Sequence, residues 1–170
     1  MMLNYRLKSI PLLALLLSMT VFLSACIGAG SSTKINYYLV DPVHVDNMEV
    51  DGSRQLAIEI LDLHIPQYLQ RFQLVSRDGD NRIHLSETNQ WAENLRKNLL
   101  RTLAINLATR LSTLDIGTPL NRSSTAPDYR LHVHIGKFER DANGRVQLSA
   151  RWQIADANEK DLGMHDANLV

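Results

Sequence analysis

The chain has 170 residues, of which 45% are hydrophobic and 21% are charged, and its formal net charge is zero. This length fits one globular domain, and the composition is too apolar and too balanced in charge for a disordered chain. Only one apolar run is long enough to be considered as a membrane span, which excludes a protein with several spans. The zero charge argues against a general nucleic-acid-binding protein, which needs a basic excess to neutralise phosphates.

The first 25 residues resemble a bacterial export signal. Arg6 and Lys8 form a short cationic region, and 14 mostly apolar residues follow at 10–23. This length is typical of a secretory signal peptide, whereas a membrane-spanning helix needs about 20 residues. The run ends in the tetrapeptide LSAC at 23–26. It resembles the bacterial lipobox, in which an apolar residue and two small residues precede the cysteine that receives lipid.

The lipobox resemblance implies cleavage between Ala25 and Cys26 and attachment of lipid, including acyl chains such as palmitate, to Cys26. The alternative is an ordinary signal peptide in which Cys26 is incidental. Because Cys26 is the only cysteine, the remaining chain can form neither an internal disulfide nor a thiolate metal site. Ile27 rather than aspartate follows the cysteine, and by resemblance to enterobacterial sorting this favours the outer membrane.

Small residues at 28–33 predict a flexible tether between the lipid and the folded part of the chain. The sequence therefore divides into three predicted parts. These are a lipoprotein signal peptide at 1–25, the lipidated Cys26 with its tether at 26–33, and a single domain at 34–170.

The first half of the domain alternates between apolar and polar residues, with turn residues between the runs. This period of two predicts short strands. The runs lie at 35–40, 56–63, 72–77 and 82–85. A short helical turn is expected at 65–69, where Pro66 takes the first helical position.

One amphipathic helix of about 25 residues is predicted after Ser86, which is its candidate N-cap. Apolar residues recur at four-residue spacing from Trp91 to Leu111, so the helix is expected to pack on a sheet by one face. The alternative is a helix that lies on a membrane surface. It rests on four basic residues off the apolar row, which are Arg96, Lys97, Arg101 and Arg110.

The second half of the domain predicts a β-hairpin. The runs at 129–139 and 146–154 each place their apolar residues on one face, and a turn signal at 141–144 joins them. The predicted fold class is therefore α+β. It has an antiparallel or mixed sheet of about five to six strands, and the one long helix packs on one face of that sheet.

Two histidines are candidate metal ligands. His132 and His134 are two residues apart in the strand predicted at 129–139, so both point to the same side, as half of a zinc or copper site would. The alternative is a polar sheet face, and we assign no metal and no cofactor. The sequence contains no phosphate-binding glycine motif and no nucleophile elbow, so no catalytic residue is assigned.

Without the export signal the chain keeps 16 basic and 18 acidic residues. This slight acidic excess predicts no nucleic-acid partner, because a phosphate backbone binds basic surfaces.

Five short motifs occur in an order and spacing that resemble one family. They are YYLVDP at 37–42, IPQYLQR at 65–71, VSR at 75–77, IHLSE at 83–87 and WAENL at 91–95. The set resembles the auxiliary lipoproteins of bacterial lipid-trafficking systems, the paraquat-inducible protein C family. The hairpin at 138–152 is similar to that family as well.

The resemblance implies a non-enzymatic lipoprotein on the periplasmic face of the outer membrane. Its implied partners are an MCE-domain protein that spans the periplasm, the inner-membrane component of that system, and the phospholipid membrane reached through Cys26. Several copies would form a ring at the docking end. Members of the family usually continue into a second long helix, whereas this chain ends at Val170. A truncated or lost element is therefore expected, with part of the sheet left for a partner to cover.

Two other functions remain open from the sequence. The chain could be another envelope lipoprotein, such as an assembly factor or a regulator of a cell-wall synthase, because a lipobox suits these equally. It could also be a metal-binding envelope enzyme built around His132 and His134.

Overall fold

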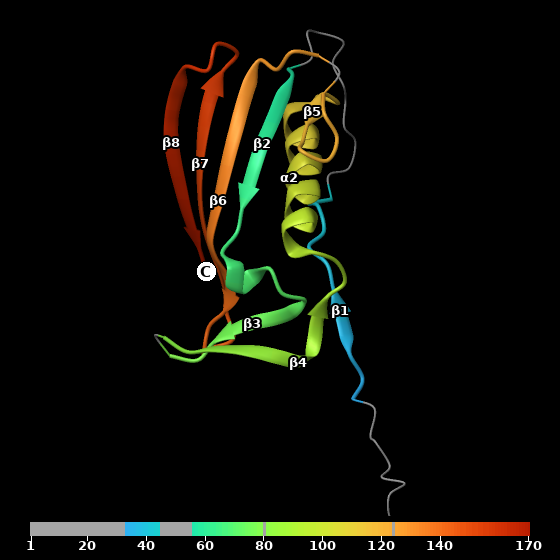
Figure 1. Cartoon of the computed structure of the whole chain (residues 1–170), viewed down its shortest axis with the longest axis vertical. Helices are drawn as coiled ribbons and strands as arrows, with labels where there is room; N and C mark the ends of the chain where they lie inside the picture. The colour runs from blue at the N-terminus through green and yellow to red at the C-terminus, as the bar shows by residue number, and fades with distance from the viewer. Residues whose placement is uncertain (1–32, 45–55, 80, 124) are drawn as a thin grey trace, which may run out of the picture. The chain divides into compact units, whose positions relative to one another are not determined.

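The structure is a computed structural model that describes residues 33–44, 56–79, 81–123 and 125–170. Residues 34–170 form one compact unit (Figure 1). Cys26, the signal peptide expected at 1–25 and the tether up to residue 32 lie outside the described residues, so the predictions made for them stay predictions.

An eight-stranded mixed sheet forms the frame of this unit. Its strands are β1 (Asn36–Tyr38), β2 (Ile58–His64), β3 (Gln73–Arg77), β4 (Ile83–Trp91), β5 (Ile116–Gly117), β6 (Tyr129–Arg140), β7 (Val146–Asp156) and β8 (Asp161–Leu169). One path runs β1-β4-β3-β6-β2-β5, while β7 pairs with β6 and β8 with β7. The predicted α+β class with one long helix is confirmed, with more strands than the sequence predicted.

The long and the short strands run in different directions. β2, β6, β7 and β8 lie side by side along the unit, whereas β3 and β4 cross its lower end (Figure 1). β6 and β7 form the predicted antiparallel hairpin. β2 pairs with β6 in parallel, which places His64 opposite His134.

The one long helix of the described residues, α2 (Leu95–Leu111), begins later and is shorter than predicted. Its N-cap is Asn94, whose side chain accepts a hydrogen bond from the backbone N–H of Lys97 at 3.2 Å. Ser86, the predicted N-cap, lies within β4, where its hydroxyl accepts from the backbone N–H of Asn89 at 3.0 Å. The prediction of Ser86 as the helix start was therefore wrong.

The error arose because Trp91 fits the four-residue spacing of the apolar row on the helix. In the structure Trp91 is the last residue of β4 and pairs with Tyr38 of β1. Its backbone N–H also donates to the carbonyl of Phe72 at 2.6 Å. Pairing with segments that are distant in sequence thus holds this stretch as a strand, and a local period cannot detect such pairing.

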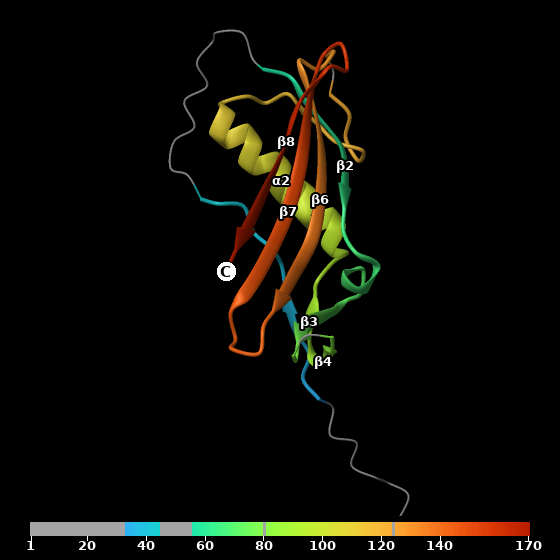
Figure 2. The same ribbon diagram turned by 90° about the vertical axis from the view of Figure 1, so that its left-hand side faces the viewer.

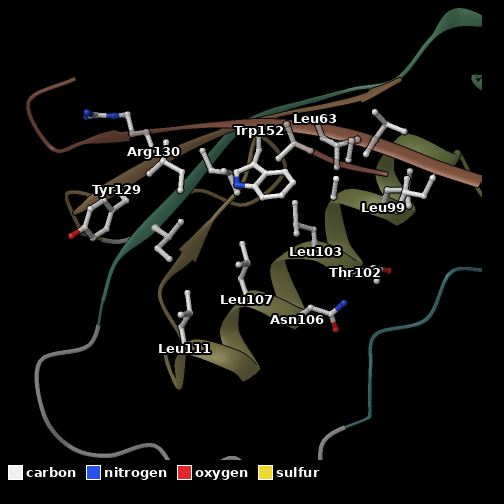
Figure 3. Close-up of a pocket in the computed structure, with 18 of the residues that line it drawn as sticks. Leu63, Leu99, Thr102, Leu103, Asn106, Leu107, Leu111, Tyr129, Arg130 and Trp152 are labelled. Atoms are coloured by element: carbon white, nitrogen blue, oxygen red, sulfur yellow. The ribbon is translucent and has the colours of Figure 1, made fainter. Parts of the chain in front are cut away.

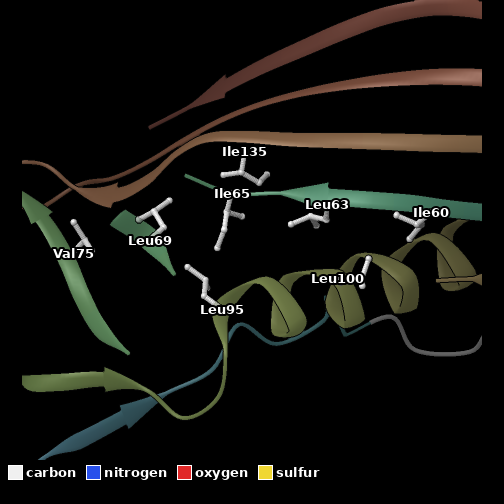
Figure 4. Close-up of a cluster of buried hydrophobic side chains, with 8 residues drawn as sticks. All are labelled: Ile60, Leu63, Ile65, Leu69, Val75, Leu95, Leu100 and Ile135. Atoms are coloured by element: carbon white, nitrogen blue, oxygen red, sulfur yellow. The ribbon is translucent and has the colours of Figure 1, made fainter. Parts of the chain in front are cut away.

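The hydrophobic core lies where α2 packs against β2 (Figure 4). Its buried side chains come from β2, β3, β6, α2, the turn η1 (Gln67–Leu69) and the link between β2 and η1. They are Ile60, Leu63, Ile65, Leu69, Val75, Leu95, Leu100 and Ile135. The helical turn expected at 65–69 is present, with Pro66 as its N-cap. Figure 2 shows α2 crossing the long strands at an angle, so the helix follows only part of their length.

Candidate functional site

An open apolar groove of about 810 Å³ lies between α2 and the long strands (Figure 3). One wall is the row of leucines that follow one another at four-residue spacing along α2, which are Leu99, Leu103, Leu107 and Leu111. The other wall is the sheet face, with Trp152 near its centre. The helix packs most closely on β2 and β5, and the groove lies between its leucine row and residues of β6, β7 and β8.

Four polar residues border the groove, and they are Thr102, Asn106, Tyr129 and Arg130. Each either forms hydrogen bonds with another part of the protein or lies at one end of the groove. Thr102 donates its hydroxyl to the carbonyl of Val40 at 2.8 Å. The guanidinium of Arg130 donates to the carbonyl of Ala157 at 3.0 Å and lies 3.8 Å from the carboxylate of Glu59. Tyr129 lies with Arg130 at one end (Figure 3). The remaining one, Asn106, binds the segment described next.

A row of polar side chains on α2 holds the segment at 40–43, which follows β1. Asn98 accepts from the backbone N–H of Val40 at 2.7 Å and donates to its carbonyl at 2.9 Å. Thr102 donates to the same carbonyl, and Asn106 accepts from the backbone N–H of Val43 at 2.9 Å. The residues Asn98, Thr102 and Asn106 have the same four-residue spacing as the leucine row, and they connect the chain after β1 to the helix.

The groove can bind but offers little for catalysis. Its volume falls within the range of about 300–1,000 Å³ that is usual for sites of apolar ligands. Its walls suit a hydrocarbon chain or the apolar face of a helix. A general acid or base must contact its substrate with a titratable group. The leucine row presents none, and the titratable side chains of Tyr129 and Arg130 lie at one end of the groove.

The predicted metal ligands His132 and His134 line one shallow hollow of about 210 Å³, which also contains His64 and Asp62. The rings of His134 and His64 stack with centroids 4.8 Å apart and an interplanar angle of 11°. Arg96 binds Asp62 at 2.5 Å and holds the pKa of its carboxyl below the usual range. Over the described ranges, no three histidine, cysteine or acidic side chains meet in an arrangement that could hold a metal ion.

A second polar cluster fastens η1 to the sheet. Glu139 is 3% exposed, and it accepts hydrogen bonds from Arg77 and, at 3.0 Å, from the hydroxyl of Tyr68. Burial acts to raise the pKa of Glu139, but the hydrogen bonds from Arg77 and Tyr68 outweigh it and leave that pKa below its usual value. Burial and the bond to Glu139 raise the pKa of Tyr68. The cluster is a structural connection between η1, β3 and β6.

Two of the four basic residues of α2, Arg96 and Arg101, are engaged within the protein. Arg96 donates to the carbonyl of Leu63 at 2.7 Å, in addition to its contact with Asp62. Arg101 pairs with Glu93. The helix therefore packs on the sheet, against β2, as predicted from its apolar row. This packing disfavours the alternative of a membrane-surface helix. In the described part of the chain no helix is both long enough and apolar enough to cross a bilayer.

Comparison with known proteins identifies the family. The model of the ABC-type transport auxiliary lipoprotein component matches residues 37–168, which is nearly the whole compact unit. The chain belongs to this family. Membership confirms the prediction made from the ordered motifs, and it makes the chain an auxiliary lipoprotein of an envelope transport system.

Two relatives of this auxiliary lipoprotein carry the same name, intermembrane transport lipoprotein PqiC. They come from Escherichia coli K12 and Shigella flexneri, and each is 27% identical over 137 residues. The match covers 79% of this chain and 69% of each relative. The names support a role in intermembrane transport.

Two solved structures share the fold of the auxiliary lipoprotein. Protein XCC0632 from Xanthomonas campestris superposes with a TM-score of 0.63 at 11% identity, covering 79% of this chain and 76% of that one. A second, uncharacterized protein gives a TM-score of 0.60 at 20% identity, covering 80% of both chains. At these identities the likeness concerns the fold alone.

Sequence reasoning found the leucine row but missed its two most informative properties. It treated the row as core, whereas part of it faces the open groove. It also passed over the polar row of Asn98, Thr102 and Asn106. The spacing of these three polar residues was the available signal. Residues four apart lie on one face of a helix, and polar side chains that are buried there need hydrogen-bond partners from another segment.

Proposed function

We propose that this auxiliary lipoprotein is a non-enzymatic docking component of an MCE-type intermembrane transport system. Cys26 anchors it to the outer membrane, on the periplasmic face. There it receives the end of an MCE-domain protein that spans the periplasm from an inner-membrane component. Several copies of the domain are arranged as a ring around that end.

The family match over residues 37–168 carries this proposal. The names of the PqiC relatives and the lipobox at 23–26 support it as well. The groove adds a physical argument, because an apolar surface with engaged polar neighbours suits binding better than catalysis. A docking protein needs such a surface and no reactive group.

The anchoring is tested by Cys26→Ser together with metabolic labelling by palmitate. The wild-type chain should carry the label and fractionate with the outer membrane, because several acyl chains hold a protein stably on a bilayer. The variant should lose the label and become soluble in the periplasm. A variant that stays in the outer-membrane fraction would show that lipid is not the main anchor.

The docking is tested by capture from the envelope, in which an MCE-domain protein should be recovered with the auxiliary lipoprotein. The size of the captured complex gives the number of copies. A single copy per complex would contradict the ring.

A further inference from the structure

We propose that one side of the β1 segment, formed by Ile35, Tyr37 and Leu39, is a membrane-contact surface that lies in the headgroup layer of the bilayer. These three residues are called the β1 stripe. The inference rests on the proposed anchoring through Cys26 and goes beyond it, because it states how the domain faces the membrane.

The β1 stripe is an exposed side of an edge strand. β1 stands at one end of the sheet path and pairs with β4. The side chains of Asn36 and Tyr38 both reach the side-chain oxygen of Asn89, at 3.3 Å and 3.1 Å, so these two point to one side. Tyr37, which lies between them, points to the other side and is 63% exposed.

The neighbours of Tyr37 extend this side along the chain. Ile35 and Leu39 are each two positions away, so the period of an extended segment places them on the same side as Tyr37. They are 38% and 47% exposed. Three large apolar or aromatic side chains in a row thus face solvent.

The position of the stripe in the chain points to a membrane as its partner. Eight residues lead from Cys26 to Lys34, and each spans at most about 3.6 Å, so the domain begins within about 29 Å of the lipidated residue. The bonds from β4 and from Asn98 on α2 hold β1 in place on the domain. The stripe therefore stays close to the bilayer in which the anchor is buried.

The chemistry of the stripe fits the interfacial layer of a bilayer. Tyrosine is enriched at this depth, because its ring is apolar and its hydroxyl contacts water and headgroups. Isoleucine and leucine gain by leaving water, and the exposed ammonium of Lys34 lies next to the stripe in sequence. Since the mature chain has a slight acidic excess, attraction to anionic lipid is not the main force. The contact should therefore persist at high salt.

A second copy of the chain is the main rival occupant. The free edge of β1 could pair with a strand of another molecule. However, β1 has only three residues, Asn36–Tyr38, so it offers few backbone groups for such pairing. The apolar side chains of the stripe, rather than its backbone edge, are the larger exposed feature.

The test measures how fast a thiol at position 37 reacts with a membrane-impermeant maleimide. The lipidated Tyr37→Cys chain is placed on vesicles of phosphatidylethanolamine and phosphatidylglycerol, where the acylated Cys26 leaves position 37 as the single free thiol. The reference is the soluble Cys26→Ser, Tyr37→Cys chain without vesicles. We expect a reaction about tenfold slower on vesicles, which corresponds to about 1.4 kcal/mol in favour of contact.

Two controls separate contact by the stripe from general shielding. Asn158→Cys places the thiol in the turn between β7 and β8, at the end of the unit away from β1 (Figures 1 and 2). It should react equally fast with and without vesicles. Adding Ile35→Ser and Leu39→Ser to the Tyr37→Cys chain should restore the fast reaction. The exposed pair Leu114→Ser and Leu120→Ser, which follows the other end of α2, should leave the protection unchanged.

Flotation of the same vesicles distinguishes the two proposals. If the protein floats but the thiol at position 37 reacts at the soluble rate, the stripe faces water and the inference is wrong, while the anchoring stands. If the protein does not float, the proposed anchoring fails and the inference fails with it. A slow reaction in the soluble chain would mean that another copy covers the stripe, which also overturns the inference.

Discussion

The side chain of Asn98 forms two hydrogen bonds with the backbone of Val40, a residue 58 positions earlier in the chain. The amide oxygen accepts from the N–H at 2.7 Å, and the amide nitrogen donates to the carbonyl at 2.9 Å. Asn98 is 1% exposed, so water cannot replace these bonds. The side chain of Asn98 thus pairs with both backbone groups of Val40, as the backbone of a neighbouring strand would. These bonds attach the segment that follows β1 to α2, the helix that forms one wall of the groove.

Asn98→Ala should lower the free energy of unfolding by about 2 kcal/mol, because it leaves the N–H of Val40 without its partner and removes one of the two hydrogen bonds to the carbonyl of Val40. Urea unfolding of the soluble Cys26→Ser chain measures this. Asn106→Ala is the matched control and should cost about 1 kcal/mol or less, because the N–H of Val43 is exposed and can bind water instead. Equal costs for the two variants would contradict the role given to Asn98.

Because some leucines of α2 are buried and others line the open groove, we expect them to contribute differently to the free energy of unfolding. Leu100 is fully buried, so Leu100→Ala should cost about 3 kcal/mol through the cavity that it leaves. Leu107 lines the open groove and is only half-buried, so Leu107→Ala should cost about 1 kcal/mol. Thermal and urea unfolding of both variants give the comparison. Similar losses at the two positions would mean that the groove is closed in solution.

Glu139 predicts a dependence of stability on pH. Its pKa in the folded protein lies below the ordinary value of 4.5. The stability that it contributes is therefore present above pH 4.5 and is lost as the pH falls through the lower folded value. Glu139→Gln should destabilise the protein at neutral pH, and its difference from wild type should shrink as the pH falls below 4.5.

The control for Glu139 is the surface pair of Glu93 with Arg101. Glu93→Gln should change stability less, because solvent screens an exposed pair. Unfolding curves of both variants over a range of pH provide the measurement. A loss at Glu139 that is the same at all pH values would show that its charge is not what matters.

The start of α2 can be tested with two substitutions. Asn94→Ala should cost about 1 kcal/mol, because it removes the side chain that caps the first turn. Ser86→Ala should leave the helix content unchanged, since Ser86 lies in β4. Far-ultraviolet circular dichroism during urea unfolding follows both variants. Loss of helix in Ser86→Ala, with no loss in Asn94→Ala, would instead support Ser86 as the N-cap of the helix.

Local patterns were enough to predict the elements whose partners are close in sequence. The hairpin of β6 and β7 is an example, because its two alternating runs are joined by a short turn. β8 was missed because Asp161, Gly163 and Asp166 are poor strand formers. It forms a strand because β7 offers it a free edge.

The groove could not be predicted, because it depends on where α2 packs. Periodicity shows that Leu103 and Leu107 share a face with other leucines, but it does not say which strands that face covers. The helix packs most closely on β2 and β5. Leucines of the same helix therefore lie in the core at one place, as Leu95 does, and line the open groove at another, as Leu107 does. The lipidation of Cys26 was predicted from a motif alone, and it remains a prediction.

Capture of the lipidated protein from cross-linked envelopes tests the central claim most directly. The chain carries an affinity tag after Val170, and proteins that co-purify with it are compared with those recovered by the Cys26→Ser chain. We expect an MCE-domain protein to be enriched with the lipidated chain, in a complex that contains several copies of this chain. Recovery of no MCE-domain protein, under conditions that keep other envelope complexes intact, would contradict the account.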